Sequence, residues 1–246
     1  MRMIVPEAGG ELDDFGLAQA YAYPRARWLR ANMVMSADGS ASVDGKSGGL
    51  SSPGDKRVFG ILRVLADVVL VGSGTVTAEQ YKPARPRPAL AALRTGRPAT
   101  ATIAVITGSL DLNLAAPLFT EAPPDARTIV ITSEAAPADL RAAAGQVADV
   151  IVAGEKAVDL PTALTALADR GLGRVICEGG PHLLGQIAAG GLLDELILTI
   201  SPTLAGPGAG RIVAGDAFPA AAMTLAQALT EDGYLFCRYL LANATS

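Results

Sequence analysis

The sequence has one histidine, two cysteines and few aromatic residues, and each scarcity excludes a class of site. A Ser-His-Asp hydrolase would have to use His182, yet no G-x-S-x-G elbow occurs. Cys177 and Cys237 lie in apolar strand-like runs, so we expect buried free thiols. No Cys/His cluster has the spacing of a zinc site, and we therefore expect no bound metal.

Clustered positive charge and long apolar stretches are also missing. The formal net charge is −4, and the scattered basic residues argue against a nucleic-acid surface. No apolar run approaches the ~20 residues of a membrane span, and the first residues lack the apolar segment of a signal peptide. We expect a cytoplasmic protein with neither nucleic-acid nor membrane partners. Hydrophobic residues make up 50% of the 246, enough to bury a sizeable core.

The most informative stretch is LGRVICEGGPHLLGQI, which begins at Leu172. Residues 174–177 form a short apolar run typical of a buried strand. Gly179 and Gly180 break the run, and Pro181 suits the first turn of a helix. Free N–H groups and the helix dipole at such a junction can hold a phosphate. The same junction is also ordinary α/β architecture, and the turn is not G-x-G-x-x-G.

Strands and helices alternate along most of the chain. Apolar runs with β-branched residues predict further strands at 29–36, 67–71, 102–106, 128–132, 147–152, 195–200 and 234–241. Helical spacing predicts helices at 53–66, 137–144, 160–168 and 181–189. This order predicts an α/β fold whose mostly parallel central sheet has helices on both faces and an antiparallel C-terminal strand. We interpret residues 1–28 as an N-terminal arm and 29–246 as a single domain.

Three glycine-bearing polar segments follow predicted strands, at 36–50, 72–79 and 178–185. Ligands of parallel sheets bind outside the carboxyl ends of the strands. A glycine- and serine-rich loop of the length of residues 39–54 inside a compact domain is often functional. These segments, with Glu178 in the last of them, are therefore the candidate site.

Together and in this order, NMVMSADGSASVDGKSGGLSS, LRVLADVVLVGSGTVTAEQY and VICEGGPHLLGQIAAGGLLDELILTISPTLAGPG resemble the reductase domain of riboflavin biosynthesis. The resemblance covers residues 29–241. It implies a dihydrofolate-reductase-like fold, an NADPH cofactor, a homodimer and reduction of the ribosyl group of a phosphorylated ribosylaminopyrimidine to ribityl. Asn32 stands where bifunctional members carry lysine, and the zinc deaminase motifs are absent, which implies the stand-alone type.

The resemblance also implies roles for single residues. The implied cofactor contacts are Met35, Gly49, Gly72, Gly74, Thr75, Glu79, Gly179, Gly180, Pro181, His182, Leu183, Leu184, Gly185 and Gln186. Ser47, Arg63 and Glu178 match substrate-contacting positions, and an arginine suits a sugar phosphate through charge-assisted hydrogen bonds. Asp38 or Glu178 would keep a substrate imine protonated or stabilise its charge. Sequence alone does not rank these two acids, and Asp38 is also explained as a simple Asp-Gly turn.

Two other functions stay open at this point. An enzyme of the same fold could reduce a pterin or dihydrofolate-type ring, in which case Arg63 and Ser47 would not be needed. A nucleotide-binding regulator without turnover is the second. The choice between NADPH and NADH is open as well, because residues 107–111 lack an arginine that many relatives carry near the adenosine 2′-phosphate.

Overall fold

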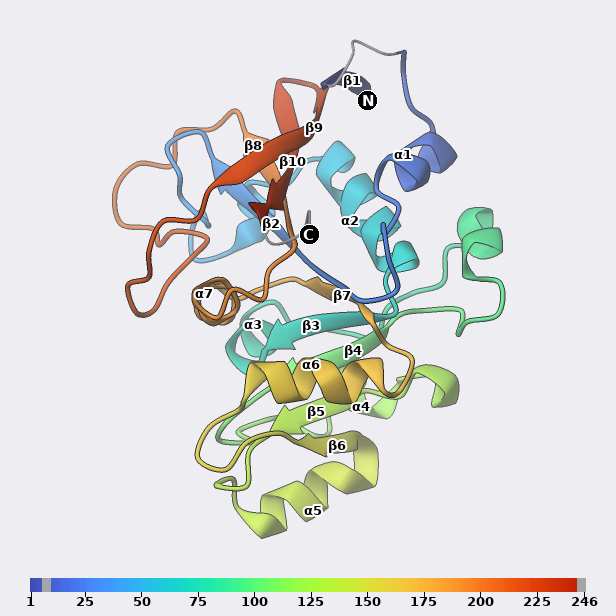
Figure 1. The fold of residues 1–246 in the computed structure, drawn as a ribbon, viewed down its shortest axis with the longest axis vertical. Coiled ribbons are helices and arrows are strands. Elements are labelled where there is room, and N and C mark those ends of the chain that lie inside the picture. Colours follow the sequence, from blue (N-terminus) through green and yellow to red (C-terminus); the bar gives the residue numbers. More distant parts are fainter. Residues whose placement is uncertain (6–9, 243–246) are drawn as a thin grey trace. The chain divides into compact units, whose positions relative to one another are not determined.

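The computed structural model describes residues 1–5 and 10–242 (Figure 1). The chain divides into two compact units. Unit 1 comprises Met1–Ala22, Leu29–Leu62 and Cys177–Ser246, and unit 2 comprises Tyr23–Trp28 and Arg63–Ile176. Each unit contains a run of neighbouring strands with its own helices, so we describe the two in turn.

Unit 1 is built mainly from antiparallel strands. Neighbouring strands follow the order β1 (Arg2–Val5), β9 (Met223–Glu231), β10 (Tyr234–Leu241), β8 (Glu195–Ser201) and β2 (Trp28–Ser36). β10 is antiparallel to both of its neighbours, which confirms the prediction for the C-terminal strand. β2 and β8 are parallel, so their carboxyl ends meet at one edge. Among the helices of this unit are α1 (Asp14–Ala20) and α7 (Pro181–Ala189).

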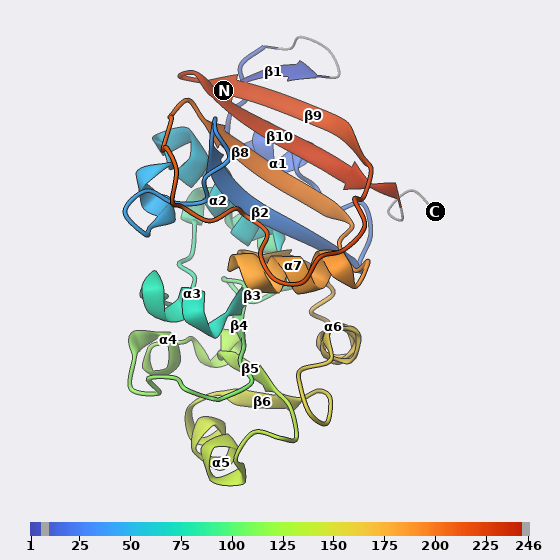
Figure 2. The same ribbon diagram turned by 90° about the vertical axis from the view of Figure 1, so that its left-hand side faces the viewer.

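Unit 2 has the alternating organisation that the sequence predicts. Its strands follow the order β7 (Arg174–Cys177), β3 (Val68–Gly72), β4 (Thr102–Ile106), β5 (Ile129–Thr132) and β6 (Asp149–Val152). The pairs from β3 to β6 are parallel. Figure 2 shows α3 (Ser73–Ala78) and α4 (Pro117–Thr120) on one side of these strands and α6 (Leu160–Ala168) on the other. The α/β fold, mostly parallel with helices on both faces, is therefore confirmed.

The remaining helices are α2 (Pro53–Leu65), α5 (Ala138–Val147) and the 3-10 helices η1 (Ser47–Gly49), η2 (Pro88–Arg94) and η3 (Pro124–Ala126). Local capping explains why α2 begins where the sequence predicts. The Ser52 hydroxyl accepts a hydrogen bond of 3.1 Å from the Asp55 N–H, and Pro53 needs no partner in the first turn. Asp159 caps α6 in the same way, with 2.9 Å to the Thr162 N–H.

The described part of residues 1–28 contains a strand and a helix. β1 pairs with β9, and α1 begins at the cap Asp13, whose carboxylate accepts from the Gly16 N–H at 2.7 Å. Leu17, Ala18 and Tyr21 are buried. The sequence analysis did not predict β1, α1 or β9.

A buried ion cluster joins the end of α1 to the strands of unit 1. Glu195 is fully buried and binds Arg30 at 3.1 Å and Arg238 at 2.8 Å. Arg30, also fully buried, donates to the Tyr21 carbonyl at 2.7 Å. Burial raises the pKa of the Tyr21 phenol, so this side chain stays neutral. The cluster fixes β2, β8 and β10 relative to the chain that follows α1.

Candidate functional site

The predicted site residues fall into both units. Unit 1 holds Met35, Asp38, Ser47, Gly49 and residues 178–186, whereas Arg63 and residues 72–79 belong to unit 2. Each set is described within its own unit. The functional roles that the resemblance implies for them remain predictions.

At the end of β2, Asp38 accepts hydrogen bonds from three groups. Its Oδ1 accepts from the Ser36 hydroxyl and, at 3.1 Å, from the Ala205 N–H, and its Oδ2 accepts from the Gly206 N–H at 2.8 Å. These bonds favour the charged form and lower the pKa of the exposed carboxyl from 3.8 to about 2. Asp38 is therefore ionised at neutral pH and has no proton to donate.

Glu178 is the second acid of the candidate site. It directly follows β7, is 8% exposed, and precedes Gly179, whose φ is +88°. The neighbouring Cys177 thiol is fully buried, which raises its pKa to about 12 and keeps it protonated. Both cysteines are free and buried, as predicted. Of the two candidate acids, Glu178 is thus the buried one and Asp38 the exposed one.

The N-terminus of α7 has the geometry that the sequence predicts for anion binding. Gly180 is its extended N-cap, and no side chain accepts from the first-turn N–H groups. His182 and Gln186 are exposed, while the side chains of Leu183 and Leu184 are buried. The Leu184 N–H donates to the Gly180 carbonyl at 3.0 Å, so a ligand at this helix end would meet the backbone N–H groups of His182 and Leu183 rather than the leucine side chains.

Gly185 has a different explanation from the one that the resemblance implies. A Cβ at this position would lie 2.0 Å from the carbonyl oxygen of Ala214. The residue must therefore be glycine because the loop after β8 packs on α7. A direct cofactor contact is not needed to account for it.

The remaining predicted site residues lie in the loop after β2 and at the junction after β3. Ser47 and Gly49 form η1, and a Cβ at Gly49 would lie 3.1 Å from Val43 Cβ. In unit 2, Gly72 caps α3 without a side-chain hydrogen bond, and Gly74 has open space around its Cα. Thr75 lies in the first turn of this short helix, and the exposed Glu79 caps its end.

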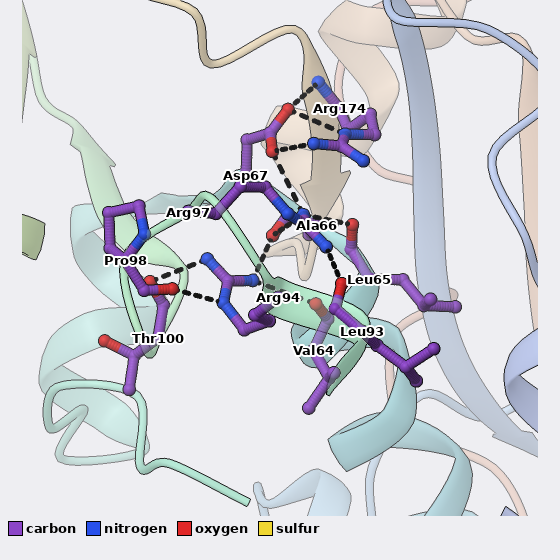
Figure 3. Close-up of polar contacts among 10 residues, drawn as sticks. All are labelled: Val64, Leu65, Ala66, Asp67, Leu93, Arg94, Arg97, Pro98, Thr100 and Arg174. Atoms are coloured by element: carbon purple, nitrogen blue, oxygen red, sulfur yellow. Dashed lines mark hydrogen bonds and ion pairs between the residues drawn. The ribbon is translucent and has the colours of Figure 1, made fainter. Parts of the chain in front are cut away.

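Arg63 lies in the last turn of α2, half-buried, with its guanidinium 5.4 Å from the centre of the Tyr81 ring. That distance is typical of a cation–π contact. The carbonyl oxygens at this helix end are bound by Arg94, which reaches Val64 at 2.9 Å and Ala66 at 2.7 Å (Figure 3). Arg94 also donates to the carbonyls of Pro98 and Thr100. It is 6% exposed.

A second arginine binds the same helix end. Arg97 donates to the Leu65 carbonyl at 3.0 Å and the Leu93 carbonyl at 2.5 Å, and it pairs with Asp67 at 3.2 Å (Figure 3). Asp67 in turn binds Arg174 through both carboxylate oxygens. We call Arg94 and Arg97 the arginine clamp. The clamp holds the last turn of α2, on which Arg63 lies, next to the start of β3.

The sequence analysis missed the arginine clamp, because it predicts neither a helix nor a strand in residues 82–100. One signal was available: no glycine follows Leu65, so the last carbonyls of α2 lack the usual backbone cap and need side-chain donors. The sequence analysis also left the loop after β8 out of the candidate site. In the structure this loop contacts both Asp38 and Gly185.

The described residues lack two further features, a metal site and a membrane-spanning helix. No group of His, Cys, Asp or Glu in this part of the chain could hold a metal ion. Among the helices of residues 1–5 and 10–242, none is both long and apolar enough to span a membrane.

Known proteins resemble this chain over most of its length. A reductase of Methanothermobacter thermautotrophicus, named 2,5-diamino-6-ribosylamino-4(3H)-pyrimidinone 5′-phosphate reductase, is 31% identical over 71% of this chain and 77% of its own. A protein of the same name from Archaeoglobus fulgidus is 29% identical over 73% and 82%. The crystal structure of a pyrimidine reductase-like protein from Corynebacterium diphtheriae superposes with a TM-score of 0.83 at 26% identity, covering 94% of this chain and 99% of that one.

The family comparison agrees with these relatives. Residues 27–233 match the family described as the RibD C-terminal domain. The match includes β2, α2, β7, α7 and β8, and so all three segments on which the resemblance rests. The chain belongs to the RibD C-terminal domain family.

Proposed function

We propose that this chain is a reductase of riboflavin biosynthesis that uses NADPH to convert the ribosyl group of a 2,5-diamino-6-ribosylamino-pyrimidinone 5′-phosphate to ribityl. The names of the two archaeal relatives support the reaction. The observation that carries it in this chain is the open N-terminus of α7 beside the buried Glu178.

A nicotinamide cofactor fits the donors that unit 1 presents. The free N–H groups in the first turn of α7, at His182 and Leu183, suit its phosphates, because no side chain competes for them. Pro181, which has no backbone N–H to donate, occupies the first position of the helix. The other cofactor contacts that the resemblance implies, including Met35 and Gly49, are part of the proposal, as is the preference for NADPH over NADH.

The chemistry divides between cofactor and protein. A nicotinamide cofactor, when bound, would supply the hydride for C1′ of the opened ribose in its imine form. Glu178 would transfer a proton to the imine nitrogen as the hydride adds to C1′, so the π electron pair of the C=N bond becomes the new N–H bond, a secondary amine forms and Glu178 is left as the carboxylate. Asp38, whose pKa is lowered to about 2 by its hydrogen bonds, is assigned no proton-transfer step in this proposal.

Absorbance of the reduced cofactor tests this proposal. Purified protein should oxidise NADPH with the ribosylaminopyrimidine phosphate and leave it unchanged with dihydrofolate. Turnover of dihydrofolate alone would instead assign a pterin or folate-type substrate. Tight cofactor binding without turnover of either compound would assign the regulator.

Replacing Arg63 by alanine should remove a charge-assisted contact to the substrate phosphate. Such a contact contributes about 1.5–3 kcal/mol, so kcat/KM for the phosphorylated substrate should fall roughly ten- to hundredfold. The loss should be much smaller for the dephosphorylated analogue, and the Kd of NADPH should hardly change. Steady-state kinetics with both analogues measure this.

Lys56→Ala is the matched control, because Lys56 is an exposed cation on the same helix. It should leave both kcat/KM values unchanged. Equal losses for the two analogues in the Arg63 variant would show that Arg63 does not bind the phosphate and that its contact with Tyr81 is its main role.

We also propose a homodimer, in which apolar side chains on β9 and β10 are covered by a second copy. Met223, Leu225 and Leu235 are 46%, 40% and 38% exposed. Leu225 lies opposite Tyr239, and the alternation of side chains places Leu235 on the same face. Light scattering should give twice the 25.0 kDa of the chain, and Leu225→Glu should give monomer. Leu140→Glu, exposed on α5, should stay dimeric; a monomeric parent protein would disprove the proposal.

A further inference from the structure

The loop between β8 and β9, residues 202–222, contains neither helix nor strand. The Ala37 N–H donates to the Thr203 carbonyl at 2.9 Å, and the Ala41 N–H donates to the Gly210 carbonyl at 2.8 Å. These two bonds tie the first half of the loop to the turn after β2.

The second half of the same loop meets α7. The Ala214 N–H donates to the Pro181 carbonyl at 3.1 Å, and the Ala214 carbonyl fills the space that a side chain at position 185 would occupy. Residues 203–215 therefore run from the end of β2 to the N-terminus of α7. Both ends of this path are segments that the proposed function uses.

Asp38 makes the side-chain contacts that hold this path in place. Its carboxylate receives the N–H groups of two successive loop residues, Ala205 and Gly206. Ser36 supports it from β2, since the Ser36 hydroxyl donates to Asp38 and accepts from the Ser40 N–H at 2.8 Å. A continuous set of hydrogen bonds thus joins the last residue of β2 to the loop.

The composition and exposure of this loop do not favour a single conformation. Gly206, Gly208 and Gly215 have φ values of +76°, +108° and +114°, and glycine loses more conformational entropy on ordering than any other residue. Most residues from 204 to 211 are exposed, so apolar burial adds little. The Asp38 carboxylate, which lies outside the loop and binds two of its successive N–H groups, offsets this cost in conformational entropy.

We propose that Asp38 is a positioning residue that fastens residues 203–215 to the end of β2, so that this loop forms one wall of the candidate site in unit 1. The inference rests on the proposed function where it concerns catalysis. It gives Asp38 a role that needs an ionised carboxylate and no proton transfer. The low pKa of this carboxyl agrees with that role.

Limited proteolysis tests the fastening without substrate or cofactor. Arg211 is the only lysine or arginine between Arg174 and Arg238, so trypsin can cut this loop at one place, which separates residues 1–211 from 212–246. In Asp38→Asn an amide nitrogen replaces one of the two carboxylate oxygens. One N–H group of the loop then faces another hydrogen-bond donor and loses its acceptor. Cleavage after Arg211, followed by mass spectrometry, should accelerate about tenfold or more, as expected when a charge-assisted hydrogen bond is lost.

Asp44→Asn is the control, because it removes the same charge from an exposed residue on the neighbouring loop. Its cleavage rate should equal that of the parent protein. Ser36→Ala keeps the carboxylate but removes its support and should give an intermediate rate. An unchanged rate in Asp38→Asn would overturn the proposal, whatever the activity of the protein.

The pH dependence of turnover separates positioning from proton donation. In Asp38→Asn, kcat/KM should fall by a factor that is constant between pH 5 and 9, since the carboxyl of the parent protein ionises near pH 2. Loss of an inflection in this range would assign Asp38 as a proton donor and overturn the inference. Absence of turnover in the parent protein would disprove the proposed function instead and leave the proteolysis result standing.

Discussion

Replacing Glu178 by glutamine is expected to lower kcat by about 10²–10⁴-fold, the range that a positioned acid contributes. Glutamine keeps the size of the side chain and its hydrogen-bonding capacity but cannot deliver a proton. Glu178 is 8% exposed and directly precedes the glycine pair at α7, so bulk water is a poor substitute for it. Single-turnover kinetics with saturating NADPH measure the chemical step directly.

The cofactor itself should bind Glu178→Gln as it binds the parent protein, because the phosphate donors belong to the backbone of α7. Fluorescence titration checks this. Glu121→Gln, an exposed carboxylate in unit 2, is the control and should keep full activity. If Glu178→Gln retained kcat within about threefold, the imine proton would have to come from another source than a positioned acid.

Some helices and strands depend mainly on their own residues, and the sequence predicts their bounds. Residues 102–106, 160–168, 174–177 and 181–189 have the same bounds in the structure as in the sequence analysis. Their apolar runs, helical spacing and Pro or Asp caps are sufficient.

β9 shows what local sequence does not contain. MTLAQALTE is rich in good helix formers, and it is a strand because β10 pairs with it along its length. One signal was present: Asp232 and Gly233, with φ of +51° and +81°, form the two-residue turn of a hairpin. α1 was missed for a related reason, since only the tertiary burial of Leu17 and Tyr21 distinguishes it from a polar arm.

The candidate site follows the same division. The glycine pair and the open end of α7 are local features, and the sequence predicts them. The backbone partners of Asp38 lie more than 160 residues away in the chain, and two of the carbonyls that Arg94 binds lie about 30 residues before it. Motif order identifies Asp38 as a residue of interest, but only the fold shows which loop its carboxylate binds.

The arginine clamp should have the largest effect on stability. Replacing Arg94 by methionine should lower the free energy of unfolding by about 3–5 kcal/mol, because a buried guanidinium and its bonds to the carbonyls of Val64, Ala66, Pro98 and Thr100 are lost together. Burial and the neighbouring Arg97 lower the pKa of Arg94 to about 10, so it still carries its proton at neutral pH. Urea unfolding followed by circular dichroism measures the loss.

Arg87→Met is the matched control, because Arg87 lies in the same segment, just before η2, and is half-exposed. It should change stability by less than about 0.5 kcal/mol, as surface substitutions usually do. Arg94→Lys should fall between the two, since an ammonium keeps the charge but cannot reach four carbonyls spread around a planar guanidinium. If Arg94→Met unfolded at the same urea concentration as Arg87→Met, the end of α2 would be held by its apolar packing, and the clamp would not be needed to fix Arg63.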